Sequence, residues 1–321
     1  MNNHITSRRD FLLIAAKLMT LGLSSGCASP IRTDGSQSER PETKEARMKL
    51  SLSTRVAESF TNKEKASLTI TELIALAQLH GYEAICMRAS QVGVHSSLER
   101  VRQISHQIQG TALNVSMVTG DFKVPMNNQF GPDGLRAITP YLNLAQTLGA
   151  DLIRICMKKD DDIPWAQRAS DEAVERGIRL AHQAHCASLF ETVDNSLTVL
   201  KKVNRSNFGI IYEPANWMLA GENYGLETIK RLQPYIFNVY VQNHRLNPNG
   251  EARVITWGRG EVRMDHIGLW ENGGVNFNQI FYSLHEVQYQ GFITVHQSFA
   301  GVMSVEEAVQ KSAQYLQPLI N

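Results

Sequence analysis

The stretch FGIIYEPANWM, residues 208–218, runs from an apolar segment directly into a carboxylate, a proline and an asparagine. The apolar part, residues 208–212, predicts a short buried strand. Glu213 follows at its end, and Pro214 prevents regular pairing from continuing because it has no backbone N–H. An acidic residue therefore lies at the end of a predicted strand. Whether it belongs to a functional site depends on whether other strands also end in polar residues.

Short apolar segments alternate with longer amphipathic segments from residue 48 onward. The amphipathic segments, such as 69–81 with its closing Gly81, have the apolar spacing and the terminal glycine that are typical of helices. Strands that alternate with helices predict parallel pairing with helical crossovers. The predicted strands are 48–53, 83–88, 113–118, 151–156, 187–191, 208–213, 236–242 and 292–296.

These strands and helices, all within residues 47–321, match the size of an α/β domain with the (β/α)8 TIM barrel fold. One of the predicted helices covers 171–185 and precedes the fifth predicted strand. A doubly wound open sheet is the alternative, but residues 51–60, SLSTRVAESF, contain no glycine-rich phosphate turn. The longest connection, 243–275, follows the seventh strand, and we expect it to lie over the barrel mouth.

The N-terminal segment has the pattern of an export signal. SRRDFL, residues 7–12, leads into an apolar run over 11–25, which predicts a twin-arginine signal within residues 1–27. Cys27 follows small residues, so the alternatives of lipidation and of cleavage without lipidation both stay open. Residues 28–46 are polar and predict a flexible linker. We therefore expect an exported protein that is periplasmic or attached to the membrane as a lipoprotein.

The composition argues against nucleic acid as a partner. Lys and Arg total 32 while Asp and Glu total 31, so no strongly basic field is present to bind a phosphate backbone. Cys86, Cys156 and Cys186 each lie in or beside an apolar segment. That placement predicts buried side chains rather than disulfides or a metal cluster.

Polar side chains recur where the predicted strands end. In a TIM barrel these ends meet at one face and form the functional site. Carboxylates, imidazoles and an amide at one mouth can bind a divalent ion such as Mn²⁺, Mg²⁺, Zn²⁺ or Co²⁺, which would polarise a carbonyl and ease proton removal from the neighbouring carbon. Each residue taken singly has the alternative of capping a strand or pairing with an arginine. The residues concerned are Arg88, Arg154, Glu191, Glu213, Gln242, His244 and His296.

Residues 48–321 resemble the xylose-isomerase-like barrels of the sugar phosphate isomerase/epimerase family. The order of several motifs along the chain is more specific than any one of them. The motifs are GYEAICMR (81–88), LFETVDN (189–195), YEPANW (212–217), VYVQNHRL (239–246), GRGEVRMDHI (258–267) and QGFITVHQSF (290–299).

The resemblance implies particular metal ligands. A metal-binding Glu at the end of the fifth strand maps onto Glu191, and Glu213 takes the place of an Asp on the sixth strand, with Asn216 retained. A His expected on the seventh strand is replaced by Tyr240. The metal ligands predicted in this way are Glu191, Glu213, Gln242, His244 and His296.

The eighth strand also departs from the family, because His296 stands where a Glu is expected. Family epimerases use carboxylates from the fifth and eighth strands as acid and base. The resemblance then implies Glu191 and His296 as the catalytic pair, since imidazole titrates near neutrality. Proton removal from one side suits isomerisation, or elimination from a keto-sugar.

Export favours a substrate that is not a sugar phosphate, such as a free sugar, an oxidised sugar or a glycoside. Arg88 and Arg154 are predicted to bind an anionic group such as a uronate carboxylate. Trp217 and Trp257 are predicted to stack on a sugar face, with packing at the barrel rim as the alternative. Asn216 is a further predicted substrate contact.

The sequence thus predicts a metal-dependent isomerase, epimerase or lyase that acts on a carbohydrate. One alternative is a carbohydrate-binding barrel that has lost its chemistry with the changes on the seventh and eighth strands. An apurinic-site nuclease on a related barrel is a second alternative, which the near-neutral charge disfavours.

Overall fold

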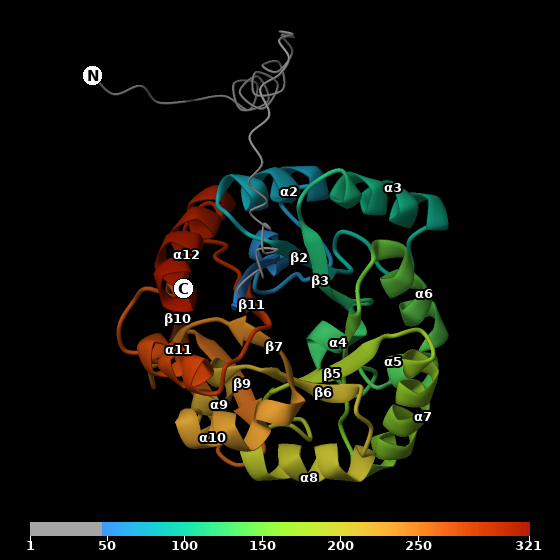
Figure 1. Ribbon diagram of the computed structural model, residues 1–321. Helices are drawn as coiled ribbons and strands as arrows, with labels where there is room; N and C mark the ends of the chain where they lie inside the picture. Colours follow the sequence, from blue (N-terminus) through green and yellow to red (C-terminus); the bar gives the residue numbers. More distant parts are fainter. Residues whose placement is uncertain (1–46) are drawn as a thin grey trace, which may run out of the picture. The chain divides into compact units, whose positions relative to one another are not determined.

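The computed structural model describes residues 47–321, which form a closed barrel of parallel strands surrounded by helices (Figure 1). Around the barrel the order is β1-β11-β7-β6-β5-β4-β3-β2. The (β/α)8 prediction is confirmed. The barrel strands are β1 Lys49–Ser53, β2 Ala84–Arg88, β3 Asn114–Thr119, β4 Leu152–Ile155, β5 Arg179–Gln183, β6 Phe208–Tyr212, β7 Ile236–Val241 and β11 Phe292–Val295.

Local sequence signals explain where many helices begin and end. At the start of α2, Thr69 and Glu72 form a capping box in which each side chain accepts the other's backbone N–H. Gly149 ends α6 with a φ of 73°, a conformation that costs glycine little. The helices are α2 Ile70–Leu79, α3 Leu98–Gln109, α4 Lys123–Met126, α5 Asp133–Arg136, α6 Thr139–Leu148, α7 Ile163–Val174, α8 Val193–Val203, α9 Pro214–Ala220, α10 Leu226–Leu232, α11 Phe277–Glu286 and α12 Val305–Ile320, with short 3₁₀ turns η1 Thr54–Ala57, η2 Asp160–Asp162 and η3 Gln233–Tyr235.

The export signal predicted for residues 1–27, the lipidation of Cys27 and the linker predicted for 28–46 lie outside the described residues. No helix within 47–321 has the length and apolar character needed to cross a membrane. Cys86, Cys156 and Cys186 are buried free thiols, as their apolar surroundings predicted.

The predicted position of the fifth strand is wrong. The helix predicted over 171–185 ends at Val174 as α7, and after Gly177 the chain forms β5, which pairs with β4 and β6. Residues 187–191, predicted as a strand, form a loop instead. This loop is apolar because it packs on the barrel, where the Phe190 ring stacks on His182 at 4.2 Å between centroids. Gln183, rather than Glu191, therefore lies at the end of the fifth strand.

The barrel interior consists of an apolar layer below a polar one. Alternation along a strand returns a side chain to the same face after two residues. Cys86, Met117, Leu152, Ala181, Ile211 and Tyr240 form a separate buried cluster contributed by six neighbouring strands. Two positions further along these strands lie the residues of the polar layer, which are Arg88, Thr119, Arg154, Gln183, Glu213 and Gln242.

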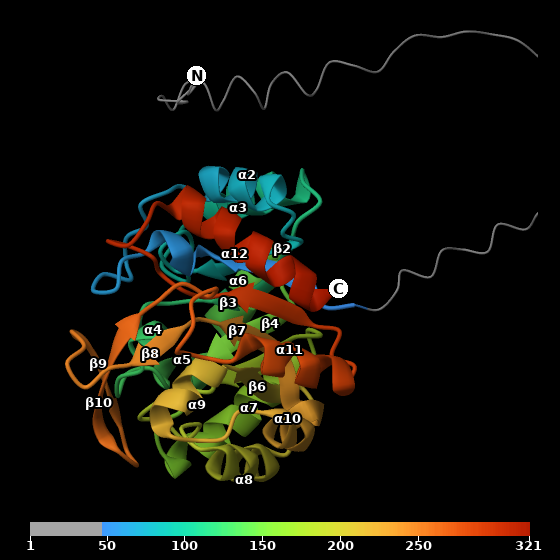
Figure 2. The ribbon, with the colours of Figure 1, turned by 90° about the vertical axis from the view of Figure 1, so that its left-hand side faces the viewer.

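The long connection after β7 forms a three-stranded antiparallel sheet from β8 His244–Leu246, β9 Ala252–Thr256 and β10 Gly260–His266. Its apolar residues Val262 and Met264 pack on Cys186 and Leu219, which follow β5 and β6. This contact places the sheet at the carboxyl-terminal end of the barrel strands, and Figure 2 shows it on the side away from the C-terminus.

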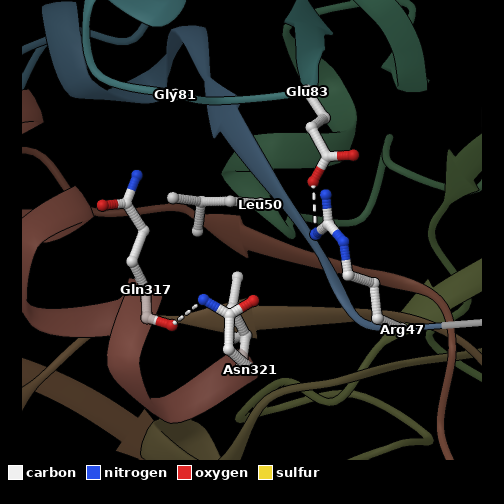
Figure 3. A pocket seen from close by; sticks show the side chains of 7 residues that line it. Arg47, Leu50, Gly81, Glu83, Gln317 and Asn321 are labelled. Carbon is white, nitrogen blue, oxygen red and sulfur yellow. Dashed lines mark hydrogen bonds and ion pairs between the residues drawn. The ribbon is translucent and has the colours of Figure 1, made fainter. Parts of the chain in front are cut away.

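A pocket of about 300 Å³ lies at the opposite end of the barrel, beside the start of β1 (Figure 3). Arg47 forms an ion pair with Glu83 there at 2.8 Å, and Asn321 donates to the Gln317 carbonyl at 2.9 Å. Its polar groups thus satisfy one another, and in TIM barrels the functional site lies at the other end. The functional site is therefore expected among the carboxyl-terminal strand ends.

Candidate active site

Glu213 is fully buried at the end of β6, where it occupies the N-cap position of α9 without a capping hydrogen bond from its side chain. Its Oε2 atom accepts hydrogen bonds from the side chains of Gln183 and Asn216, the latter at 2.7 Å. The side chain of Gln242 also favours the ionised form of this carboxyl. The Oε1 atom has no hydrogen-bond partner in the described chain. Two amides therefore hold Oε2 and leave Oε1 without a partner.

Burial raises the pKa of Glu213 to about 7, because desolvation of the carboxylate outweighs the opposing effects of Gln183, Arg154 and the other donors. Near neutral pH the carboxyl is therefore present in both protonation states. A group of this kind can take a proton from a bound molecule and return it.

The two arginines predicted to bind substrate have different surroundings. Arg88 is held by Glu58, whose two oxygens accept from Nε and Nη2 at 2.8 Å each. Arg154, only 4 % exposed, forms no hydrogen bond or ion pair with any residue of the 47–321 domain, and its Nε is unsatisfied. Its guanidinium carbon lies 6.0 Å from the centre of the Tyr240 ring. Of the two, Arg154 is therefore free to bind a ligand.

His296 is buried directly after β11. Its Nδ1 lies 3.0 Å from the Ser53 hydroxyl, and its ring stacks on Tyr240 with centroids 3.8 Å apart. Burial, followed by the positive charges of Arg88 and Arg154, holds the pKa of His296 well below its usual range. At neutral pH this imidazole is therefore uncharged and is a weak base.

Glu191 does not lie at the end of the fifth strand, contrary to prediction. Its carboxylate accepts the backbone N–H groups of Ala187 at 2.5 Å, Trp257 at 2.8 Å and Gly258 at 2.9 Å. Residues 257 and 258 form the tip of the β9–β10 hairpin. Glu191 therefore fastens this hairpin to the loop after β5, and both of its oxygens are already engaged.

The other predicted ligand and substrate residues have varied positions. His244 lies 3.0 Å from His266, measured between their Nδ1 atoms, and burial lowers its pKa to about 3. Trp217 is fully buried and packs edge-on against the Tyr212 ring, and its contact with substrate stays a prediction. Trp257 is 55 % exposed at the hairpin tip.

The residues at the barrel mouth do not fit a divalent cation. The part of the chain that the structure describes contains no group of three or more His, Cys, Asp or Glu side chains that could hold a metal ion. Glu191 and His244 are engaged elsewhere, so the polar layer offers one carboxylate, Glu213, and neutral amides. The positive charge of Arg154 acts on Glu213 and would repel a cation. We derive no chemical step through a metal.

A model of the xylose isomerase-like TIM barrel family matches residues 74–319. The chain belongs to this family. No curated protein matches the sequence of this xylose isomerase-like barrel. The family assignment agrees with the resemblance found in the sequence motifs.

Solved structures with the same fold include enzymes of different chemistry. The probable 3-DHS dehydratase AsbF from Bacillus anthracis is 16% identical, with a TM-score of 0.64 over 84% of this chain and 99% of its own. The IOLI protein, solved with a zinc atom, is 15% identical with a TM-score of 0.63, over 85% and 98%. D-allulose 3-epimerase from Methylomonas sp. is 15% identical with a TM-score of 0.61, over 86% and 99%. At this level of identity the similarity shows a shared fold.

Sequence reasoning missed four residues near the site. Gln183 was placed in a helix, and Arg55, Glu58 and Lys63 lie in the connection after β1, for which no role was predicted. The available local signal was Gly177, a residue that commonly ends a helix, inside the segment predicted as one helix.

The role of Glu191 as a fastener can be tested with Glu191→Gln. The amide loses the charge and one acceptor, so we expect a loss of about 1 to 3 kcal/mol at this contact. Hydrogen exchange should accelerate in the hairpin, residues 252–266. Glu261→Gln, which removes exposed ion pairs with Arg253 and Arg263, is the matched control and should change the hairpin little. Unchanged exchange in Glu191→Gln would contradict the role.

The side chains available as metal ligands also predict how much metal the protein binds. After incubation of the purified protein with Mn²⁺, Zn²⁺ and Co²⁺ and removal of free ions, we expect far less than one ion for each chain, because only one carboxylate is available. Elemental mass spectrometry measures this quantity. Stoichiometric metal that disappears in Glu213→Gln would show that the mouth does bind a cation.

Proposed function

We propose that this barrel is an isomerase, epimerase or lyase that moves a proton next to the carbonyl of a sugar or keto-sugar, with Glu213 as the acid and base. The observation that carries the proposal is the state of Glu213. It is fully buried, its Oε1 is unpartnered, and its pKa is raised to about 7 at the face where TIM barrels carry their sites. The dehydratase and the epimerase with the same fold support this class of reaction.

In this proposal ionised Glu213 takes the proton from the carbon beside the carbonyl through Oε1. The C–H electron pair then moves toward the carbonyl carbon and leaves negative charge on the carbonyl oxygen. Arg154 stabilises that charge, because its guanidinium lies in the same buried layer and has no other partner. In an isomerisation, protonated Glu213 gives the proton to the former carbonyl carbon, and the proton of the neighbouring hydroxyl passes to the former carbonyl oxygen. In an elimination, Glu213 gives the proton to a hydroxyl whose C–O bond breaks, so that water departs and the electron pair forms a C=C bond.

Gln183 and Asn216 act as positioning residues in this scheme. Both donate to Oε2, and Asn216 also donates to the Ala184 carbonyl at 2.8 Å. These contacts hold the carboxyl in one orientation and turn Oε1 away from the donors. A fixed base of this kind loses little entropy when the substrate binds.

A carbohydrate-binding barrel without catalysis is the second candidate. The neutral His296 and the engagement of Glu191 elsewhere favour it, because they leave the polar layer with a single carboxylate for proton exchange. Binding of sugars without any exchange of carbon-bound hydrogen would distinguish this candidate from the enzyme.

Exchange of hydrogen with solvent tests the catalytic proposal. A panel of keto-sugars and oxidised sugars in D₂O should show deuterium incorporation or product with the wild type. Glu213→Gln keeps the size of the side chain and removes the base, so turnover should fall at least about 100-fold. Glu175→Gln, on the exposed surface, should leave turnover unchanged. Equal turnover in wild type and Glu213→Gln would refute the assignment.

The raised pKa of Glu213 predicts a dependence of stability on pH. Because the folded-state pKa lies above the usual 4.5, the contribution to stability is complete below about pH 4.5 and is lost as the pH rises through about 7. The loss is about 3 kcal/mol, at about 1.4 kcal/mol for each tenfold change in proton affinity.

Glu213→Gln should lack this loss. Between pH 4.5 and 8, the free energy of unfolding of Glu213→Gln, measured by urea denaturation, should therefore rise relative to that of the wild type by up to about 3 kcal/mol. Buried histidines titrate in both proteins, so their effects cancel in the difference. A difference that does not vary with pH would show that Glu213 has an ordinary pKa.

A further inference from the structure

Arg154 is a buried cation without a counterion in the described chain. Its side chain comes from the end of β4 and is 4 % exposed, and its Nε has no hydrogen-bond partner. Buried charges in proteins are almost always paired, because an isolated charge loses its hydration without compensation. The unpaired guanidinium therefore marks the place of an anionic group that residues 47–321 do not themselves supply.

Three more cations surround the same region. The positive charges of Arg88, Arg154, Arg55 and Lys63 all act on His296. One carboxylate, Glu58, pairs with both Arg88 and Arg55, at 2.8 and 3.3 Å. Lys63 donates only to the Pro125 carbonyl, at 3.0 Å. The group therefore carries more positive charge than Glu58 can balance.

The pKa values of two of these cations are lowered, as expected for positive charges that are buried close together. Burial, followed by the charges of Arg55, Arg88 and Arg154, lowers the pKa of Lys63 to about 8. Burial, followed by the charge of Arg88, lowers the pKa of Arg55 to about 10. An added anion would relieve the repulsion that these shifts express.

The nearby acids have other partners. Asp121 accepts from the Tyr141 hydroxyl at 2.6 Å and from the Val124 N–H at 3.0 Å. Glu191 is held by backbone N–H groups. Glu213 forms no ion pair with Arg154 and is partly protonated near neutral pH. No acidic side chain in residues 47–321 therefore forms an ion pair with Arg154, and the interaction of Arg154 with Glu213 is through charge alone.

We propose that the substrate is a sugar acid or keto-acid whose carboxylate binds the guanidinium of Arg154, with the carbon that loses its proton facing Oε1 of Glu213. This inference rests on the proposed function and adds the charge and class of the substrate. Two parallel N–H groups of the planar guanidinium match a carboxylate, and its remaining N–H groups stay available to the carbonyl oxygen on which negative charge develops. A phosphate ester is the less fitting anion, because the region lacks the glycine-rich turn at a helix N-terminus that phosphate groups favour.

Matched ligands test the charge preference by titration calorimetry. Glucuronate and galacturonate should bind the full-length protein at least 10-fold more tightly than glucose and galactose, and added salt should reduce the difference. Glucose 6-phosphate and inorganic phosphate form a second arm, and both should bind more weakly than the uronates. Uronates that bind no better than neutral sugars, or phosphates that bind best, would overturn the inference.

Arg154→Gln should remove the preference for the acid over the neutral sugar. Arg154→Lys keeps the charge but loses the planar fork, so it should weaken uronate binding at least 5-fold, and it serves if Arg154→Gln does not fold. Arg205→Gln, which breaks an exposed pair with Asp171, is the matched control and should bind like the wild type. A preference that survives both Arg154 variants would also overturn the inference.

Deuterium exchange separates this inference from the proposed function. Uronate binding that depends on Arg154, without exchange in the bound ligand, would support the carboxylate site and contradict the proton-transfer role of Glu213. Exchange in neutral keto-sugars at the same kcat/KM as in their acids would support the proton-transfer role of Glu213 and contradict the carboxylate site. Absence of binding by every acid in the panel would contradict the carboxylate site.

Discussion

Closure of the barrel is the constraint on which the rest of the structure depends. Eight parallel strands that close on themselves direct every second side chain inward, and the space they enclose is filled in layers. Leu152 and Ile211 belong to the apolar layer, and Arg154 and Glu213 follow two residues later on the same strands. The apolar layer excludes water from below, which is why a carboxyl directly above it has a raised pKa.

The polar layer differs in charge from a metal centre. A divalent ion would need several anionic or imidazole ligands directed to one point, whereas the described chain offers Glu213, which is held by two amides and feels the positive charge of Arg154. The positive charge at this barrel mouth therefore comes from protein side chains such as Arg154. Under the proposed function, this charge stabilises an oxyanion.

The sheet formed by β8, β9 and β10 depends on a contact that is distant in sequence. Glu191, in the loop after β5, accepts the N–H groups of Trp257 and Gly258 at the hairpin tip. The apolar contacts of Val262 and Met264 lie beneath the same sheet. The carboxylate and the apolar underside together keep the long connection against the barrel, so that it forms one wall of the mouth.

Seven of the eight strands were predictable because each is a short apolar run between helical segments. Glu213 was recognisable because Pro214 ends its strand at the carboxylate. The fifth strand was missed because RLAHQ contains no β-branched residue. It forms where β4 and β6 offer hydrogen bonds on both sides, a condition that no local window contains.

The sequence by itself therefore determined the fold class, the family and the ring of polar strand ends. Tertiary structure alone decided which of those ends form a site. Glu58, 30 residues before Arg88 in the chain, neutralises that arginine, while nothing within residues 47–321 forms an ion pair with Arg154. The physical reason is that hydrophobic periodicity is a local property, whereas the pairing of charges depends on distances through space that exist only after the barrel has closed.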